Sequence, residues 1–350
     1  MKNRRRAVIL MVVFAGLSST FSFYLYQIIM SPNLQVAKSS IEILLPNGAN
    51  FRSVQDTLYK YRVVQDMVSF SFLAKLMDYT ELVKPGLYSI QPNMTNIQAI
   101  RLLRSGDQAP SRLSFSHARL IEDLYEPVTR YVEITEADFG MALTNFVSNN
   151  NRGFNPNNII SMFIPNTYQV YYTISAADLV QKINKEYYRF WSEKNLTKAS
   201  DIGLSPLEVS TLASIVQAEA SKDEESEIIA GLYLNRLKDG IPLQADPTLV
   251  FAVRDFSLVR VLNEHKMIDS PYNTYINKGL PPGPINMPTI HSLNAVLNYA
   301  HHNYIYMCAK EDFSGFHNFT ASYREHTENA RRYQRQLSIE QRTARNRKNQ

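Results

Sequence analysis

The chain begins with a long apolar stretch. No charged residue occurs from Ala7 to Met30, and a short basic stub, residues 1–6, comes before it. A transmembrane helix needs about 20 apolar residues, so this stretch is long enough to cross a bilayer. A cleavable signal peptide would have a shorter apolar core and an Ala-x-Ala-like end, whereas here the run continues through Phe23–Tyr26. The pattern predicts an uncleaved anchor, residues 7–30. Because the basic residues come first, we expect the N-terminus in the cytoplasm and the rest of the chain outside the inner membrane.

Residues 39–106 alternate between strand-like and helix-like patterns. Ile41–Pro46 resembles a strand that ends at the turn signal Asn47-Gly48, and Pro85–Ile90 resembles a turn and a second strand. Apolar residues at helical spacing lie between and after these strands: Val54, Leu58 and Tyr61, then Phe70, Leu73, Ala74 and Met77, then Ile97, Ile100 and Leu103. We expect a small α/β subdomain that ends near Gly106.

Residues 107–200 have a less regular pattern and are expected to connect this subdomain to the next. Five segments can be interpreted: helices at Leu120–Val128 and Ala137–Val147, a polar loop at Asn149–Asn158, a turn leading into a strand at Ile164–Tyr168, and an amphipathic helix at Ala176–Trp191.

The clearest helix start in the chain is Ser205-Pro206-Leu207-Glu208. Ser205 can cap the helix, proline fits its first position and Glu208 can complete a capping box. At about 100° per residue, Glu219 shares a face with Leu212, Ile215 and Val216, whereas Gln217 faces away.

A carboxyl group on an apolar face has particular chemistry. Burial disfavours the ionised form and raises the pKa, and a carboxyl that stays protonated near neutral pH can protonate a glycosidic oxygen. Two structural alternatives remain open. The helix could end before Glu219, or Glu219 could form a structural ion pair with an arginine such as Arg236.

The residues after this helix are rich in turn signals. We expect a second helix capped by Ser221, with Glu224 three residues later, that stops at Gly240. Loops are then expected at Gln244–Thr248, Tyr272–Tyr275 and Gly279–Ile285. Prolines stiffen such loops and reduce the entropy lost on binding, and their amide, hydroxyl and aromatic side chains suit a ligand with many hydroxyl groups.

Charge and metal-ligand patterns argue against several functions. The net charge is +5, but eight basic residues lie at the two ends of the chain and the remainder is slightly acidic, which argues against nucleic-acid binding. The single cysteine, Cys308, cannot form an internal disulfide and has no Cys-x-x-Cys partner. The seven histidines include no His-Glu-x-x-His pattern. We expect no metal and no cofactor.

The order and spacing of motifs from Ser205 to Tyr333 resemble those of MltG-type (YceG-like) endolytic murein transglycosylases. The stretches that carry the resemblance are Leu212–Ser221, Leu234–Leu237, Pro242–Thr248, Tyr272–Tyr275 and Gly279–Ile285, with His317–Phe319 and Glu325–His326 near the end. Two positions differ from the usual pattern. Gln217 stands where many relatives have a glutamate, and Asn166 stands where relatives often have an aspartate.

This resemblance implies an α+β fold with a single N-terminal transmembrane helix. It makes residues 39–106 a LysM-like subdomain that binds glycan and residues 201–335 a larger mixed α+β catalytic domain, with 107–200 as the connecting part. Residues 336–350 would then be a solvated basic tail.

The resemblance also implies the reaction of a lytic transglycosylase, a carbon–oxygen lyase acting on a polysaccharide. Glu219 would protonate the oxygen between N-acetylmuramic acid and N-acetylglucosamine, then take the proton of the muramoyl C6 hydroxyl, which closes a 1,6-anhydro ring. The partners would be peptidoglycan strands, the inner membrane and penicillin-binding synthases, and cutting would terminate nascent strands. Eight residues are candidates for binding the substrate: Asn235, Arg236, Gln244, Asp246, Tyr272, Asn273, Tyr275 and His317.

Two other classes of function stay open. A non-catalytic scaffold of the cell-wall synthesis machinery would use the same anchor and glycan-binding subdomain. A metallohydrolase would need zinc ligands, for which His317 and His326 are the candidates.

Overall fold

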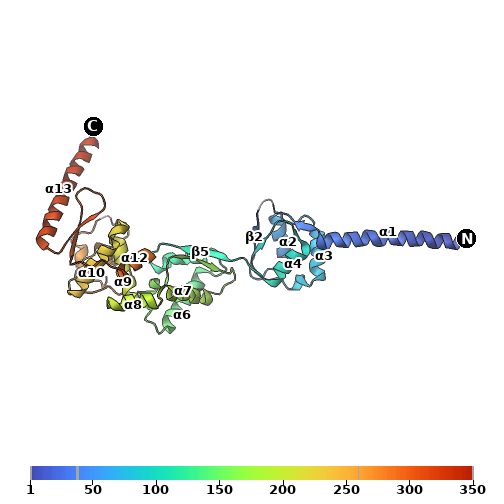
Figure 1. The fold of residues 1–350 in the computed structure, drawn as a ribbon, viewed down its shortest axis with the longest axis horizontal. Helices are drawn as coiled ribbons and strands as arrows, with labels where there is room; N and C mark the ends of the chain where they lie inside the picture. The colour runs from blue at the N-terminus through green and yellow to red at the C-terminus, as the bar shows by residue number, and fades with distance from the viewer. Residues whose placement is uncertain (1, 37–38, 259, 349–350) are drawn as a thin grey trace. The chain divides into compact units, whose positions relative to one another are not determined.

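The computed structural model describes residues 2–36, 39–258 and 260–348. Met1 of the predicted basic stub and residues 349–350 of the predicted tail lie outside this range. The chain forms two compact units, each built from more than one segment (Figure 1). Unit 1 contains residues 1–113, 129–135 and 168–175, and unit 2 contains residues 114–128, 136–167 and 176–350. The predicted α+β class is confirmed, with the strands gathered in four two-stranded sheets among the described residues.

The first element, α1 (Lys2–Met30), is one uninterrupted helix. Its segment Arg4–Met30 has a mean hydropathy of 2.0 in its most apolar window, and no residue of that window is buried in protein. The helix is therefore long and apolar enough to cross a membrane, and it contains the predicted span. Ile28, near its end, is only 6% exposed and belongs to the core of unit 1.

Unit 1 is built around an antiparallel pair of strands, β2 (Ile41–Leu45) and β3 (Gly86–Ile90), in which Ile43 lies opposite Tyr88. A second pair joins β1 (Pro32–Leu34) to β4 (Met94–Thr95). The strands and helices expected between residues 39 and 106 are all present. The helices are α2 (Phe51–Lys60), α3 (Met67–Leu76) and α4 (Asn96–Ser105), with a 3-10 turn η1 (Tyr79–Glu81).

The helices of unit 1 are capped by polar side chains at their starts. Asn50 and Thr95 form capping boxes at the starts of α2 and α4, and Asp66 accepts backbone N–H bonds at the start of α3. Gly106 ends α4 in the left-handed conformation, with φ of 77°.

A buried polar cluster joins the end of α1 to the rest of unit 1. The Asn96 side chain donates to the carbonyl oxygen of Ile28 at 3.0 Å and accepts from the Asn33 side chain at 2.7 Å. Because buried polar groups are costly unless they are hydrogen-bonded, this cluster fixes how α1 leaves the unit.

The next segments contribute to both units. Strand β5 (Ser111–Phe115) pairs with β6 (Asn166–Val170). Three predictions, the helix near 137–147, the strand after Pro165 and the helix from Ala176, are confirmed. The predicted helix Leu120–Val128 is partly wrong, since its first half is a 3-10 turn. The remaining elements here are η2 (Ile121–Leu124), α5 (Tyr125–Thr129), α6 (Glu136–Asn149), η3 (Ile159–Met162), α7 (Ala176–Phe190) and α8 (Glu193–Asp201).

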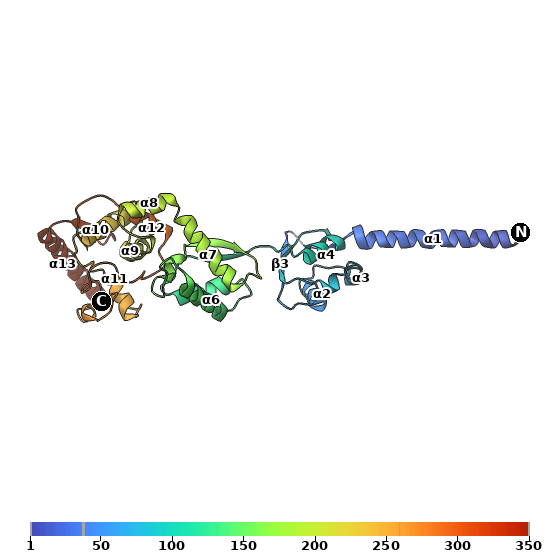
Figure 2. The same ribbon diagram turned by 90° about the horizontal axis from the view of Figure 1, so that it is seen from below.

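Helix α9 (Pro206–Glu219) lies at the centre of unit 2, packed against α10 (Ser226–Lys238), α11 (Asp246–Val253) and α12 (Ile290–Leu297) (Figure 2). All residues from Val209 to Val216 are buried. The sequence pattern predicts one apolar face, but the helix is covered on all sides along this part.

Two predicted features after α9 are wrong. Ser221 does not cap the next helix, because α10 begins at Ser226, after a 3-10 turn η4 (Asp223–Glu225). Gln244–Thr248 is only partly a loop, because Asp246 starts α11 and Pro247 fits its first turn. Gly240 does follow the end of α10, with a φ of 63°. After η5 (His265–Met267) and α12, strands β7 (Tyr306–Ala309) and β8 (His317–Thr320) pair, and α13 (Tyr323–Lys348) packs against them.

Candidate active site

Glu219 is the last residue of α9. The capping box at the other end is formed as predicted, with the Ser205 N–H donating to the Glu208 carboxylate at 2.8 Å. Ala220 leaves the helical conformation, with φ of −73° and ψ of 103°. The alternative that the helix stops before Glu219 is therefore wrong.

The Glu219 carboxyl group lies in a mostly buried environment. The Tyr233 hydroxyl donates a hydrogen bond to its Oε1 atom at 3.1 Å. Burial raises the pKa of Glu219 to about 7, and the nearby Asp246 charge also raises it, while the Tyr233 hydrogen bond and the Arg236 charge lower it. Burial, followed by the charge on Glu219, also holds the pKa of Tyr233 well above its usual value, so that this phenol stays a donor.

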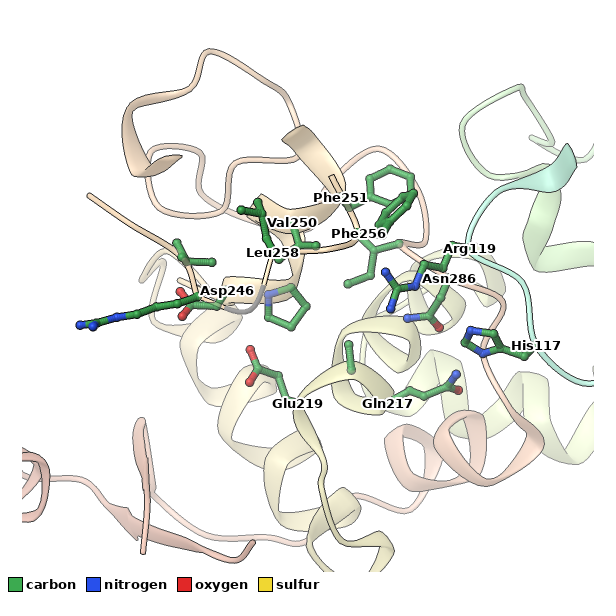
Figure 3. A pocket seen from close by; sticks show the side chains of 15 residues that line it. His117, Arg119, Gln217, Glu219, Asp246, Val250, Phe251, Phe256, Leu258 and Asn286 are labelled. Carbon is green, nitrogen blue, oxygen red and sulfur yellow. The ribbon is translucent and has the colours of Figure 1, made fainter. Parts of the chain in front are cut away.

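Two pockets of unit 2 meet at this carboxyl. The larger has a volume of about 560 Å³ and the smaller about 310 Å³, and Glu219 and Asp246 line both. Figure 3 shows the two carboxylates on one side of the larger pocket and His117, Arg119 and Asn286 on the other. An acid at the junction of two pockets can reach a bond whose two substituents occupy one pocket each.

The larger pocket combines aromatic and cationic side chains. The Arg119 guanidinium lies 4.8 Å from the ring centre of Phe256 and makes no ion pair among the described residues. Asn286 donates through Nδ2 to the Ser214 carbonyl oxygen at 2.9 Å, which orients its amide. Aromatic faces and guanidinium groups suit sugar rings and carboxylates.

The smaller pocket contains two oriented polar pairs. The Tyr275 hydroxyl donates to Asp246 Oδ1 at 2.5 Å. His317 Nδ1 donates to the buried Glu225 carboxylate at 2.8 Å, and Glu225 also accepts the His317 backbone N–H at 2.8 Å. When the ring is neutral, this hydrogen bond leaves His317 Nε2 as its acceptor nitrogen.

Arg236 organises the wall of the smaller pocket. It is 7% exposed and donates to the carbonyl oxygens of Ile305 at 2.6 Å, Leu243 at 2.8 Å and Pro242 at 3.0 Å. Among the described residues it forms no ion pair with Glu219, so the predicted alternative of a direct pair is wrong. Its charge nonetheless favours the ionised form of Glu219.

Of the eight predicted substrate-binding residues, the smaller pocket brings together five: Arg236, Gln244, Asp246, Tyr275 and His317. The other three lie elsewhere. Asn235 donates to the His302 and Tyr304 carbonyl oxygens, at 2.8 and 3.0 Å.

Asn273 and Tyr272 also have structural contacts. Asn273 is fully buried and holds its own loop through the carbonyl oxygens of Lys266 and Ile268. The ring of Tyr272 packs against that of Phe251, with 4.7 Å between the ring centres, and it lines a separate pocket of about 100 Å³. The side-chain amides of Asn235 and Asn273 thus donate to backbone carbonyl oxygens of the protein itself.

Gln217, at the position where many relatives have a glutamate, points away from Glu219 as predicted (Figure 3). Its Oε1 atom accepts from the Thr289 N–H at 2.6 Å and from the Ser292 hydroxyl at 2.7 Å. It ties α9 to the start of α12.

Sequence reasoning missed Tyr233, Glu225, His117 and Arg119. Tyr233 lies three residues before Arg236 on the same helix, and that spacing places both on one face. His117 and Arg119 come from a segment far upstream with no regular pattern, so no local signal indicates them.

No group of three or more potential metal ligands gathers among the residues that the structure describes. Of the two candidate zinc ligands, His317 is hydrogen-bonded to Glu225, and the ring of His326 stacks on that of Tyr306 with 5.1 Å between the ring centres.

Known proteins resemble this chain over most of its length. The model of the YceG-like family matches residues 43–332. A protein of Streptococcus pneumoniae (strain D39) named endolytic murein transglycosylase is 26% identical over 343 residues, which cover 86% of this chain and 60% of that protein. A Bacillus subtilis (strain 168) protein of the same name is 25% identical over 325 residues, covering 87% and 88%. The chain thus spans about 60% of the length of the pneumococcal relative.

The fold also resembles that of a solved structure. A crystal structure of a YceG-like protein from Listeria monocytogenes superposes with a TM-score of 0.54, at 24% identity, covering 83% of this chain and 99% of that one. The family model covers far more than half of the chain, so the protein belongs to the YceG-like family.

Proposed function

We propose that this protein is an endolytic lytic transglycosylase that cuts peptidoglycan glycan strands between N-acetylmuramic acid and N-acetylglucosamine. The observation that carries the proposal is the Glu219 carboxyl, which has a pKa of about 7 and lies where two pockets meet. The names of the pneumococcal and Bacillus relatives support the same activity.

Glu219 serves first as an acid and then as a base. Its proton passes to the glycosidic oxygen as the bond to the muramoyl C1 atom breaks. The resulting carboxylate then takes the proton of the muramoyl C6 hydroxyl, whose oxygen bonds to C1 and closes the 1,6-anhydro ring. A group with a pKa near the working pH can perform both transfers. Tyr233 holds the carboxyl in place and stabilises its ionised form.

The glycan strand lies across both pockets, with one sugar on each side of Glu219. The larger pocket offers Arg119, Phe251 and Phe256, and the smaller offers Gln244, Tyr275 and His317. Two pockets that meet at the acid suit cleavage within a strand, because residues of the polymer are held on both sides of the bond.

Asp246 favours a second candidate function, a two-carboxylate glycoside hydrolase. Ordinary glycosidases pair an acid with a second carboxylate that attacks the sugar or activates water, and Asp246 lines both pockets beside Glu219. The two reactions differ in their products, because hydrolysis leaves a reducing end and the lyase leaves an anhydro end that is one water lighter.

The wider placement of the protein follows from α1. The helix anchors the chain in the inner membrane with its N-terminus in the cytoplasm, so that the site acts outside, where new cell wall is made. Residues 39–106 act as a LysM-like glycan-binding subdomain, residues 201–335 as the catalytic domain, and cleavage terminates nascent strands beside penicillin-binding synthases. A non-catalytic scaffold would use the same anchor and subdomain.

The test is Glu219→Gln, with Glu224→Gln as the matched control because Glu224 is exposed and lies outside both pockets. Purified glycan strands are digested and the products are weighed by mass spectrometry. Loss of a general acid costs about 10²–10⁴-fold in rate, so we expect Glu219→Gln to lose at least that much while Glu224→Gln and the wild type release anhydro-muropeptides. Equal release by Glu219→Gln would overturn the assignment of Glu219. Reducing ends from the wild type would establish the hydrolase, and no release by the wild type would favour the scaffold.

A further inference from the structure

Helix α3 of unit 1 carries an apolar stripe that faces solvent. Val68, Phe72 and Leu76 are 75%, 53% and 68% exposed, and their spacing of four places them on one face. The opposite face is also apolar, because Phe70, Leu73 and Ala74 are buried in the core. A surface helix normally has polar residues on its outer face, so α3 is suited to an apolar environment on both sides.

This stripe continues from the surface of α1. Helix α3 packs against α1, and Phe21 and Leu25 of α1 line an apolar hollow of about 250 Å³ together with Val68 and Phe72. Figures 1 and 2 both show α3 beside the end of α1 where that helix joins unit 1. Both helices belong to unit 1, so their arrangement is a property of one compact body.

The position of α3 along α1 sets its depth in a bilayer. The apolar part of α1 starts after Arg6, and a hydrocarbon core of about 30 Å takes about 20 helical residues. Counted from Ala7, the outer edge of the hydrocarbon falls close to Tyr26. The hollow shared with α3 is lined by α1 residues from Phe21 to Ile28, so α3 lies at the level of that edge.

We propose that α3 lies in the outer surface of the membrane, with Val68, Phe72 and Leu76 among the lipid acyl chains. Lys75 is exposed and adjacent to this stripe on the helix, so its stem covers apolar surface while its ammonium group reaches the lipid headgroups. The occupant of the face is the lipid itself, because the face is continuous with the only described helix that can span a bilayer.

A second contact with the membrane has a mechanical result. A protein held by one helix can rotate about the helix axis and tilt away from the surface, whereas α1 and α3 together fix the orientation of unit 1 against the bilayer. The inference rests on α1 as a membrane anchor and is independent of the proposed reaction.

The test places a fluorescent probe at single positions of the full-length chain, in a Cys308→Ser background. Phe72→Cys and Leu76→Cys carry the probe on the stripe, and Tyr59→Cys is the matched control, since Tyr59 is an apolar residue of α2 that is 80% exposed. The protein is reconstituted into vesicles of phosphatidylcholine and phosphatidylglycerol, some of which carry lipids with a quencher near the headgroup end of the acyl chain. Circular dichroism checks that each variant is folded.

We expect the probes at positions 72 and 76 to emit at shorter wavelength and to lose emission to the lipid quencher, while the probe at position 59 stays accessible to a water-soluble quencher. Equal access of the water-soluble quencher to all three positions would overturn the proposal. Protection of position 72 in native membranes but not in pure lipid vesicles would also overturn it, because a membrane protein would then be the occupant. Activity on purified strands is measured in parallel, so that a failure of the proposed reaction is recognised separately.

Discussion

At the scale of single residues, the proposed chemistry depends on opposing influences on the pKa of one carboxyl group. Burial and the Asp246 charge raise the pKa of Glu219, whereas the Tyr233 hydrogen bond and the Arg236 charge lower it. The resulting pKa of Glu219, about 7, keeps both its protonated and its ionised form populated near neutral pH. Changing any of these groups should therefore shift the pH range of the proposed reaction.

Two substitutions should shift the pH profile in opposite directions. Tyr233→Phe removes a hydrogen bond to the ionised carboxylate, so the pKa of Glu219 rises and the alkaline limb of kcat/KM moves to higher pH. Asp246→Asn removes a neighbouring negative charge, so the pKa falls and the limb moves to lower pH. The measurement is the rate of anhydro-product release from pH 5 to 9.

Tyr299→Phe serves as the control for these profiles, since Tyr299 lines neither pocket at Glu219. Shifts of the same sign in Tyr233→Phe and Asp246→Asn, or unchanged limbs in both, would show that the limb does not report Glu219.

The sequence predicted that Glu219 lies on α9, because that position depends on local helix geometry. The spacing of Leu212, Ile215 and Val216 and the capping box at Ser205 determine where α9 begins and which way residue 219 points. Tyr233 and Glu225 could not be found in this way. Tyr233 reaches Glu219 because α10 packs against α9, and Glu225 of η4 is hydrogen-bonded to His317 of β8. No short-range pattern encodes these contacts.

At the scale of elements, the proline-rich loop Gly279–Ile285 supports the larger pocket through a close backbone approach. A Cβ atom on Gly283 would lie 2.0 Å from the Asn157 carbonyl oxygen. Two residues later, the Ile285 N–H donates to the Ser214 hydroxyl of α9 at 3.0 Å. The loop is thereby held between α9 and the segment at Asn157, and it carries Ile285 and Asn286 to the pocket wall.

Gly283→Ala should therefore destabilise unit 2 and reduce activity. Overpacking against a fixed neighbour costs about 1–3 kcal/mol, and here the neighbour is backbone that cannot move aside by rotating a side chain. Pro282→Ala is the control, because Pro282 is the exposed residue next to it. Urea unfolding of the two variants gives the comparison, and equal midpoints would show that the loop relaxes without cost.

Elements with strong local signals were predicted, and those held by their surroundings were not. Helix α9 has a capping box that the sequence makes visible, and α2 and α4 have apolar residues at helical spacing. The short helix α12 and the paired strands β7 and β8 depend on contacts with α9 and α13 that arise only in the folded protein. The sequence Asp246-Pro247 is compatible with a turn and with the start of a helix. Which of the two forms depends on tertiary packing, and in this structure it is the start of α11.

At the scale of the whole molecule, the anchor and unit 1 are continuous. Ile28 of α1 is part of the core, and its carbonyl oxygen accepts the hydrogen bond of the buried Asn96 side chain. A soluble form that starts after Met30 therefore lacks part of the fold of unit 1.

A chain of residues 27–350 should be more stable than one of residues 31–350. The shorter chain lacks the buried side chain of Ile28, and truncating a core isoleucine to alanine lowers the free energy of unfolding by about 2–5 kcal/mol. It also lacks the Ile28 carbonyl oxygen, so the Asn96 side chain loses one hydrogen-bond acceptor. Hydrogen exchange of the amides in β2, β3 and α4 measures the difference, and unit 2 provides the internal control. Equal protection in both chains would show that the end of α1 adds nothing to unit 1.

The order of elements between residues 39 and 106 was predictable, but the division of the chain into units was not. Residues 129–135 and 168–175 belong to unit 1, although their neighbours on both sides belong to unit 2. A search for linkers along a sequence divides the chain into consecutive domains. It therefore cannot identify units that are built from separate segments.

The position of Glu219 as the last residue of α9 has an electrostatic consequence. The peptide dipoles of a helix add up to about half a negative charge at its C-terminal end, which disfavours a carboxylate there by about 0.3–1 kcal/mol. This field adds to burial in favouring the protonated acid in the resting enzyme. In the proposed reaction the proton leaves for the glycosidic oxygen, and the ionised Glu219 then lies beside the negative end of the α9 dipole. That repulsion favours uptake of the C6 hydroxyl proton, which restores the protonated acid.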